Sequence, residues 1–242
     1  MITPGDVSER PARWGVIESL AGLGLAVVLM WLLVRWLTSG IYYDGYLAFI
    51  LSYAVVWIPL LGACLFACFV TGTRSLRADY GLRVTALDVL FGLGAGLLLR
   101  AFASVVEIAF YGRMSGLGVQ FGDIVYDGWW VFGTLLAPIL LAPFIEELFF
   151  RGLVQRTARR VSERVMPAGL AVFVSIVVSA ALFAVLHLTE STNATAAAVL
   201  GISTFALGLT SALIAALTGR IGGSIIAHMT FNGSFVLAAL MA

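Results

Sequence analysis

Long runs of apolar residues, separated by short polar stretches, dominate the chain. None of these runs alternates apolar and polar residues as a half-buried strand would. Each is close to the roughly 20 residues that an α-helix needs to cross a bilayer. The pattern therefore predicts an all-α fold, a polytopic integral membrane bundle of about seven transmembrane helices. We place the seven runs near Leu20–Leu37, Tyr46–Val70, Leu87–Tyr111, Trp129–Phe150, Ala168–His187, Ala194–Thr218 and Gly223–Ala242.

Composition supports a membrane environment. Of the 242 residues, 61% are hydrophobic and only 11% are charged, whereas soluble domains are about 45–50% apolar and about 25% charged. These values exclude a soluble globular enzyme and a nucleic-acid-binding protein, and they leave the lipid bilayer as the expected surroundings. Because no repeat or long linker divides the chain, we expect one membrane-embedded domain over residues 1–242.

The distribution of arginine predicts the orientation of the bundle. All 14 basic residues are arginine, and with seven spans the loops on one side carry eleven of them. Loops on the other side hold Arg113, with Arg35 at an edge. The positive-inside rule then predicts a cytoplasmic N-terminus and an external C-terminus, and the compact, arginine-only chain favours a bacterial inner membrane. The eleven are Arg10, Arg13, Arg74, Arg77, Arg83, Arg151, Arg156, Arg159, Arg160, Arg164 and Arg220.

Charged residues inside the third run need an explanation, because a charge at bilayer depth costs at least ~2.5 kcal/mol. This run contains Asp88, Arg100 and Glu107. Arg100 and Glu107 are seven residues apart and share one helix face. They form either an internal ion pair that fixes helix packing or one polar wall of a cavity.

The fourth run ends in the segment PFIEELFFRG, with adjacent glutamates at Glu146 and Glu147. Glu147 and Arg151 have the i,i+4 spacing of an ion pair. Glu146 points about 100° away from that face and has no local partner. An unpartnered carboxylate in a water-poor site suits a general base. The alternative is that both glutamates reach the cytoplasmic interface, where a short basic helix over Gly152–Val165 would balance them.

The two histidines of the chain both fall in predicted spans. His187 follows Phe183 by one helical turn, and His228 precedes Asn232 by one turn. Such residues can serve helix packing alone. Together with Glu146, however, they supply a base, an imidazole partner and two donors for an oxyanion, which are the parts needed to hydrolyse an amide with water.

Three motifs in this order carry a family resemblance. They are E-E-x-x-x-R-G at Glu146–Gly152, F-x-x-x-H at Phe183–His187 and H-x-x-x-N at His228–Asn232. They resemble the CAAX protease and bacteriocin-processing (CPBP) family of intramembrane proteases, which includes the type II CAAX prenyl endopeptidases. Phe205 and Gly208 are similar to that family's F-x-x-G element.

The resemblance covers the chain from Leu136 onward and places a motif-bearing catalytic core at about residues 129–242, while the first three spans match no motif. It implies an endopeptidase that hydrolyses a peptide bond of a membrane-associated peptide or protein. The implied roles are water activation by Glu146 and His187, oxyanion binding by His228 and Asn232, and support by the Glu147–Arg151 pair.

Cofactor use stays open at this point, because the family has been described both as metalloproteases and as metal-independent glutamate proteases. If a metal is present, Glu146, His187 and His228 would be its ligands, as a His₂Glu zinc site with an open position. The chain has no H-E-x-x-H motif, and an asparagine one turn from His228 suits an oxyanion better than zinc. We therefore favour no metal.

Two other functions compete with proteolysis. The chain could be a non-catalytic membrane protein, such as an immunity factor or scaffold, that keeps the motifs as structure. It could also be a transporter in which Arg100, Glu107 and the glutamate pair line a polar path. Against transport, the two halves show no matching pair of interrupted helices.

The depths of the site residues conflict if every span is a straight crossing. Glu146 would then lie near the cytoplasmic end of its helix and His228 about 8 Å inside that face, at about 1.5 Å per residue. His187 would lie near the outer end of its own helix. Either the Glu146 helix continues through the basic segment, or the fifth span is tilted or begins deep.

Overall fold

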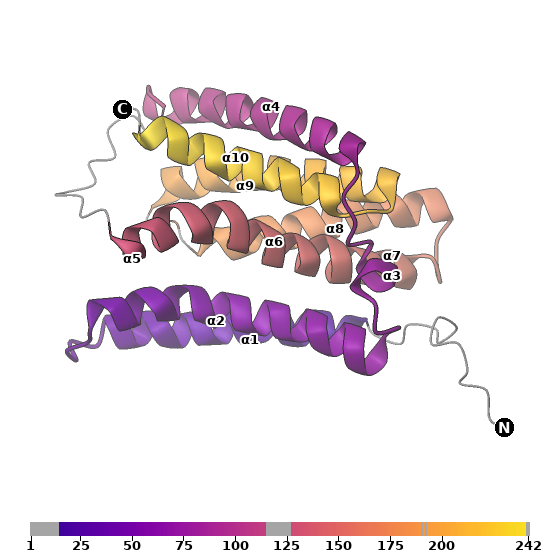
Figure 1. Ribbon diagram of the computed structural model, residues 1–242, viewed down its shortest axis with the longest axis horizontal. Coiled ribbons are helices and arrows are strands. Elements are labelled where there is room, and N and C mark those ends of the chain that lie inside the picture. The colour runs from indigo at the N-terminus through magenta and orange to yellow at the C-terminus, as the bar shows by residue number, and fades with distance from the viewer. Residues whose placement is uncertain (1–14, 115–126, 190, 192, 241–242) are drawn as a thin grey trace.

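The computed structural model describes residues 15–114, 127–189, 191 and 193–240 (Figure 1). Every regular element in these residues is helical, which confirms the predicted all-helical membrane bundle. The elements are α1 Val16–Leu37, α2 Gly45–Phe66 with the π-helical η2 Ala67–Thr71, α3 Leu76–Tyr80, α4 Ala86–Tyr111, α5 Gly128–Trp130, η3 Val131–Leu141, α6 Ala142–Glu147, η4 Leu148–Val154, α7 Gln155–Ser162, α8 Ala168–Leu188, α9 Ala194–Thr218 and α10 Gly222–Leu240.

Six helical stretches in the described residues are long and apolar enough to cross a membrane. They correspond to the first six predicted runs. The seventh run is also a helix, α10, although it is not among these six. It packs most extensively against α4 and also contacts α9 and η3. The protein is therefore an integral membrane bundle in which α10 is one of the less apolar helices.

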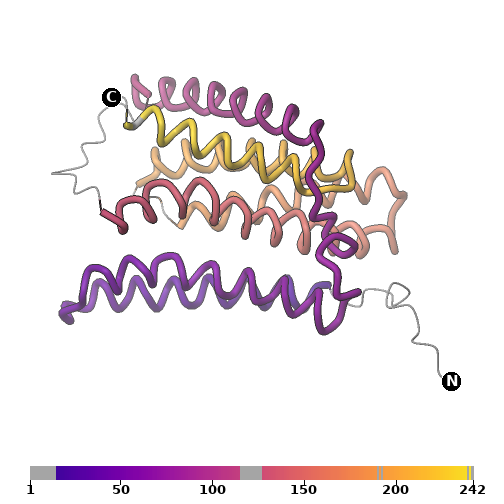
Figure 2. The backbone as a smooth tube through the Cα atoms, viewed as in Figure 1, coloured from indigo at the N-terminus to yellow at the C-terminus, as the bar shows by residue number. Residues whose placement is uncertain are grey.

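The helices form three groups (Figure 1). The α1–α2 pair lies on one side, α4 and α10 lie on the other, and α5–α7, α8 and α9 lie between them. Figure 2 shows the chain leaving α2 and passing through α3 across one end of the bundle to reach α4. At that same end α1 begins, α7 turns into α8, and α9 turns into α10.

Small residues let α4 and α10 approach closely. A Cβ at Gly92 would lie 2.7 Å from Cβ of Ile226, and one at Gly96 would lie 2.5 Å from the carbonyl oxygen of Ala227. Membrane helices associate through such close backbone contact, and the G-x-x-x-G spacing is its usual sequence signature. This contact places the helix that carries His228 against α4.

The fourth span differs from its prediction. The structure has one continuous helical stretch over Gly128–Ser162, 35 residues long, and not a span ending at Phe150 followed by a separate basic helix. Two π-helical segments, η3 and η4, flank the short α6. Pro138 and Pro143 have no amide hydrogen to complete α-helical hydrogen bonds, which accounts for the wide turns of η3. Glu146 consequently lies in the middle of a long helix.

The charged residues of α4 are paired. Arg100 Nη2 lies 2.6 Å from Glu107 Oε2 and 3.0 Å from Ser104 Oγ, and its guanidinium lies 5.3 Å from the ring of Phe235 on α10. These contacts support the hypothesis that the Arg100–Glu107 pair fixes helix packing, and not the hypothesis that it forms the wall of a cavity.

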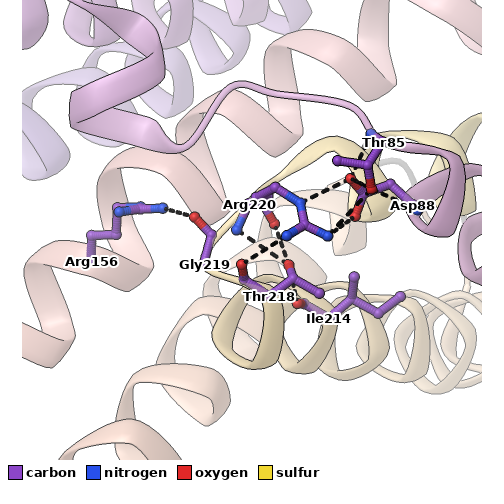
Figure 3. Close-up of polar contacts among 7 residues, drawn as sticks. All are labelled: Thr85, Asp88, Arg156, Ile214, Thr218, Gly219 and Arg220. Carbon is purple, nitrogen blue, oxygen red and sulfur yellow. Dashed lines mark hydrogen bonds and ion pairs between the residues drawn. The ribbon is translucent and has the colours of Figure 1, made fainter.

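A second ion pair joins the start of α4 to the α9–α10 turn (Figure 3). Arg220 donates from Nε and Nη2 to the two carboxylate oxygens of Asp88, each at 2.9 Å. Asp88 is almost fully buried and also accepts from the amide of Thr85, which caps α4. Because Arg220 lies two residues before α10, this pair holds the start of the helix that carries His228.

We expect Arg220→Gln to lower the melting temperature, because it leaves the buried Asp88 carboxylate without its partner. Adding Asp88→Asn should recover part of the loss, since the unpaired charge is then gone. Thermal unfolding of the purified protein measures both. Arg159→Gln is the matched control, because the Arg159–Glu163 pair is exposed and such pairs contribute little. Equal effects of Arg220→Gln and Arg159→Gln would contradict the role given to Asp88.

Candidate active site

The two glutamates of α6 have different surroundings. Glu147 is fully buried and its Oε1 lies 3.0 Å from Nη1 of Arg151, one turn along the same helix. This confirms the predicted ion pair, although Nη1 approaches the carboxylate outside hydrogen-bond geometry. Glu146 is 8% exposed and has no arginine contact. Both glutamates are therefore enclosed within the bundle.

Arg151 is enclosed by α8 and α9. Its Nη2 donates to the carbonyl oxygen of Gly208 at 3.0 Å, and its guanidinium lies 4.6 Å from the ring of Phe183. A Cβ at Gly208 would lie only 3.0 Å from Cα of Ala180, so glycine lets α9 lie against α8 here. Arg151 was predicted as a loop arginine, and this was wrong: it is 1% exposed and bonded inside the bundle.

His228 lies between the two glutamates. Its Nδ1 is 3.0 Å from Glu147 Oε1, and its Nε2 is 3.9 Å from Glu146 Oε2. A carboxylate only accepts, so Nδ1 carries the hydrogen of this bond. In a neutral ring Nε2 is then unprotonated, and it becomes a donor only when the imidazole is charged. Glu147 thus fixes the orientation of the His228 ring.

His187 faces Glu146 from the end of α8. Its Nδ1 lies 2.9 Å from the carbonyl oxygen of Phe183, so Nδ1 carries the hydrogen and Nε2 of a neutral ring is free to accept. That Nε2 is 3.8 Å from Glu146 Oε2. The ring of Phe183 packs against both imidazoles, with centroids 4.4 Å from His187 and 5.5 Å from His228.

Asn232 has a different partner. Its Nδ2 donates to the carbonyl oxygen of Pro138 at 2.7 Å. That carbonyl has no usual partner in its own helix, because the amide of Ala142 bonds to Ala137 and the next residue, Pro143, has no amide hydrogen. Asn232 therefore ties α10 to η3, which the sequence analysis missed; the two closely spaced prolines are the signal that could have shown it.

Five of the six predicted site residues come together: Glu146, Glu147, Arg151, His187 and His228. Asn232 lies one turn beyond His228 and contacts Pro138. The conflict of depths disappears because the Glu146 helix continues to Ser162. With both glutamates ionised, the cluster holds two negative charges and the positive charge of Arg151.

The described residues contain no group of three His, Cys, Asp or Glu side chains with metal-site geometry. The Nε2 atoms of His187 and His228 do face the same oxygen of Glu146. Nδ1 of His228 bonds to a second carboxylate, which is also the arrangement of a metal-ligating histidine. The same three groups could also contact a water molecule.

The comparison with protein families places this site in a known context. Residues 128–234 match the family model described as type II CAAX prenyl endopeptidase, Rce1-like. Comparison with curated proteins and with solved structures returns no match. The matched segment contains all six residues predicted for the site and begins where the long helix begins. The predicted resemblance is thus confirmed: residues 128–234 are similar to the Rce1-like family of type II CAAX prenyl endopeptidases.

Proposed function

We propose that this protein is an intramembrane endopeptidase that hydrolyses a peptide bond of a membrane-associated peptide or protein. One observation carries the proposal: Glu146 Oε2 faces Nε2 of His187 at 3.8 Å and Nε2 of His228 at 3.9 Å, inside a helical bundle. A charged side chain inside the membrane costs free energy, so its presence needs an explanation. The ion pair explains Glu147 and Arg151, but no such pair explains Glu146. The family match supports peptide hydrolysis as the reaction class.

Glu146 acts as the general base in this proposal. Oε2 of Glu146 is too far from the Nε2 atoms of His187 and His228 for direct hydrogen bonds. A water molecule that hydrogen-bonds to both groups would bridge each of these gaps. Glu146 takes a proton from that water as its oxygen attacks the scissile carbonyl carbon, and His187 accepts a second hydrogen bond from the same water. The proton then passes to the leaving amine, which yields a carboxylate and a free amine.

His228 stabilises the oxyanion that forms on the carbonyl oxygen. This role requires its charged form, because Nδ1–H is already donated to Glu147. Glu147 and Arg151 therefore support catalysis by holding this ring in place. Asn232 has one amide hydrogen left after its bond to Pro138, and we assign that hydrogen to the same oxyanion. No metal is needed for these steps.

The orientation belongs to the proposal as well. At one end of the bundle lie α3 with the loops on either side of it, α7 with the turn after it, and the α9–α10 turn (Figure 1). Among the described residues, these segments carry Arg74, Arg77, Arg83, Arg156, Arg159, Arg160, Arg164 and Arg220. By the positive-inside rule this end is cytoplasmic, as is the N-terminus, and the C-terminus is external. We place the protein in a bacterial inner membrane on its composition. The non-catalytic and transporter alternatives leave the Glu146–histidine geometry without a use.

We expect Glu146→Gln to fold normally and to lower peptidase activity by about 10²–10⁴-fold, because the amide keeps the shape but cannot take a proton. Activity is measured on peptides with and without a C-terminal prenyl group, with thermal unfolding as the folding control. Glu163→Gln is the matched variant, since it removes an exposed glutamate just beyond the same helix. Wild-type cleavage by Glu146→Gln would end the proteolytic account.

The Glu147–Arg151 pair should matter first for stability. Arg151→Ala leaves a buried carboxylate uncompensated, which costs about 3–5 kcal/mol. The double variant Glu147→Gln with Arg151→Met should unfold at a higher temperature than Arg151→Ala. It should remain poorly active, because His228 has lost its carboxylate partner. If Arg151→Ala is as stable as the wild type and merely inactive, Arg151 contacts the substrate instead.

Metal dependence has its own test. We expect activity to survive a strong chelator, and His228→Ala to leave the metal content of the purified protein unchanged. A contrary result has three parts: chelation abolishes activity, added zinc restores it, and His228→Ala loses bound metal. His187 and His228 would then be ligands together with Glu146, and the oxyanion role of His228 would fail.

A further inference from the structure

A polar cavity of about 410 Å³ lies at the arginine-rich end of the bundle, between α3, α7, α8 and α9 (Figure 1). Small residues alternate in its walls with polar side chains, which include Asp79, Arg151, Gln155, Arg156, Arg159 and Ser175. Arg159 is exposed, whereas Arg151 and Gln155 are buried, so the cavity runs from the surface into the bundle. Cavities that stay dry are apolar, whereas roomy polar ones hold water. The walls of this cavity therefore suit water.

A line of buried polar residues continues from the cavity toward the candidate active site. Gln155, Arg151 and Glu147 are four residues apart along the long helix, so they follow one another by about one turn on one face. All three are buried. Among the described residues, no hydrogen-bond partner reaches Gln155 Oε1, Arg151 Nε or Glu147 Oε2. Buried polar atoms in proteins are bonded to other protein groups or to bound water, so this line suits water as well.

Two of these side chains are held in the same way by α9. Gln155 Nε2 donates to the carbonyl oxygen of Ala212 at 2.8 Å, and Arg151 Nη2 donates to that of Gly208 at 3.0 Å. These bonds fix both side chains and leave Gln155 Oε1 as an acceptor and the Nε–H of Arg151 as a donor. One water molecule can donate to the first and accept from the second. The inner end of the cavity is thus equipped to bind water.

The proposed reaction consumes one water molecule in each turnover, and its site is enclosed. Glu146 is 8% exposed and His228 is 2% exposed. Glu146 also lies roughly 24 Å from the end of its helix at Ser162, at about 1.5 Å per residue. A bound peptide would cover the Glu146 side of the site. Water that arrives along the side of Glu147 could reach the site while the peptide stays in place.

We propose that this cavity is a water-filled passage and that Gln155 and Arg151 bind water at its inner end. The role of the passage rests on the peptidase activity proposed above: it supplies the water that is consumed at Glu146. Gln155 is in this account a positioning residue, because it holds water that travels to the site and does not touch the reacting atoms.

Cysteine labelling of the purified protein tests whether water fills the cavity. Ser175 lines it from α8, and Ser179, one turn further along α8, is buried and bonded to the carbonyl oxygen of Phe150. A charged methanethiosulfonate reacts with a thiolate that it reaches through water. We expect Ser175→Cys to react at least about tenfold faster than the matched control Ser179→Cys. The unsubstituted protein, in which Cys64 and Cys68 are buried, gives the background rate.

The labelled protein then tests the supply of water. The attached group fills part of the cavity, so kcat should fall about tenfold while KM stays unchanged, because the peptide binds on the other side of the site. The proposal is overturned if Ser175→Cys and Ser179→Cys react equally, or if complete labelling of Ser175→Cys leaves kcat unchanged. Should Ser175→Cys fail to fold, Ala215→Cys on the α9 wall takes its place, with the buried Ala212→Cys as its control.

Gln155→Leu tests the inner end of the passage. It removes the oxygen that binds water and keeps a side chain of similar size, so kcat should fall by up to about tenfold with KM unchanged. Thr157→Val is the matched control, because Thr157 is a buried polar residue of the same helix outside the cavity lining. Equal kcat values for the two variants would contradict the role of Gln155. Since labelling needs no substrate, failure of the proposed function shows separately, as absent cleavage by the unsubstituted protein.

Discussion

The buried charge of Glu147 is the constraint on which the rest of the site depends. A carboxylate cannot stay ionised in the interior of a helical bundle without partners. Arg151 provides one from the same helix and His228 provides the other from α10. To reach Glu147, Arg151 must itself be enclosed, and the carbonyl of Gly208 and the ring of Phe183 complete its surroundings. One ion pair thus fixes the relation of the long central helix to α8, α9 and α10.

Glu146 shows how adjacent residues acquire different chemistry. It is next to Glu147 in α6, but its side chain points toward two imidazole nitrogens and not toward a guanidinium. Glu147 is therefore paired with Arg151, while Glu146 faces only the two imidazoles, which is the basis for proposing it as the general base. This difference between the two glutamates depends on the position of α10. That helix is held at His228 and also near its start, where Arg220 bonds to Asp88.

Local features of this site could be predicted from the sequence, and distant ones could not. The pairing of Glu147 with Arg151 follows from i,i+4 spacing on one helix. The bond between Asp88 and Arg220 joins residues 132 positions apart, and helical periodicity carries no information about it. The contact of Asn232 depends on a proline carbonyl exposed by π-helical turns. Those same turns let one helix continue far past the predicted end, which is why the expected depths disagreed.

The central claim is that Glu146, His187 and His228 surround one reacting carbonyl carbon. The most direct measurement is an experimental structure with a substrate peptide in which a phosphinate replaces the scissile amide, as a mimic of the tetrahedral intermediate. The account predicts one phosphinate oxygen within hydrogen-bond distance of Glu146 and His187, and the other facing His228 Nε2. It is contradicted if the phosphinate coordinates a metal held by the histidines, or if the peptide binds away from Glu146.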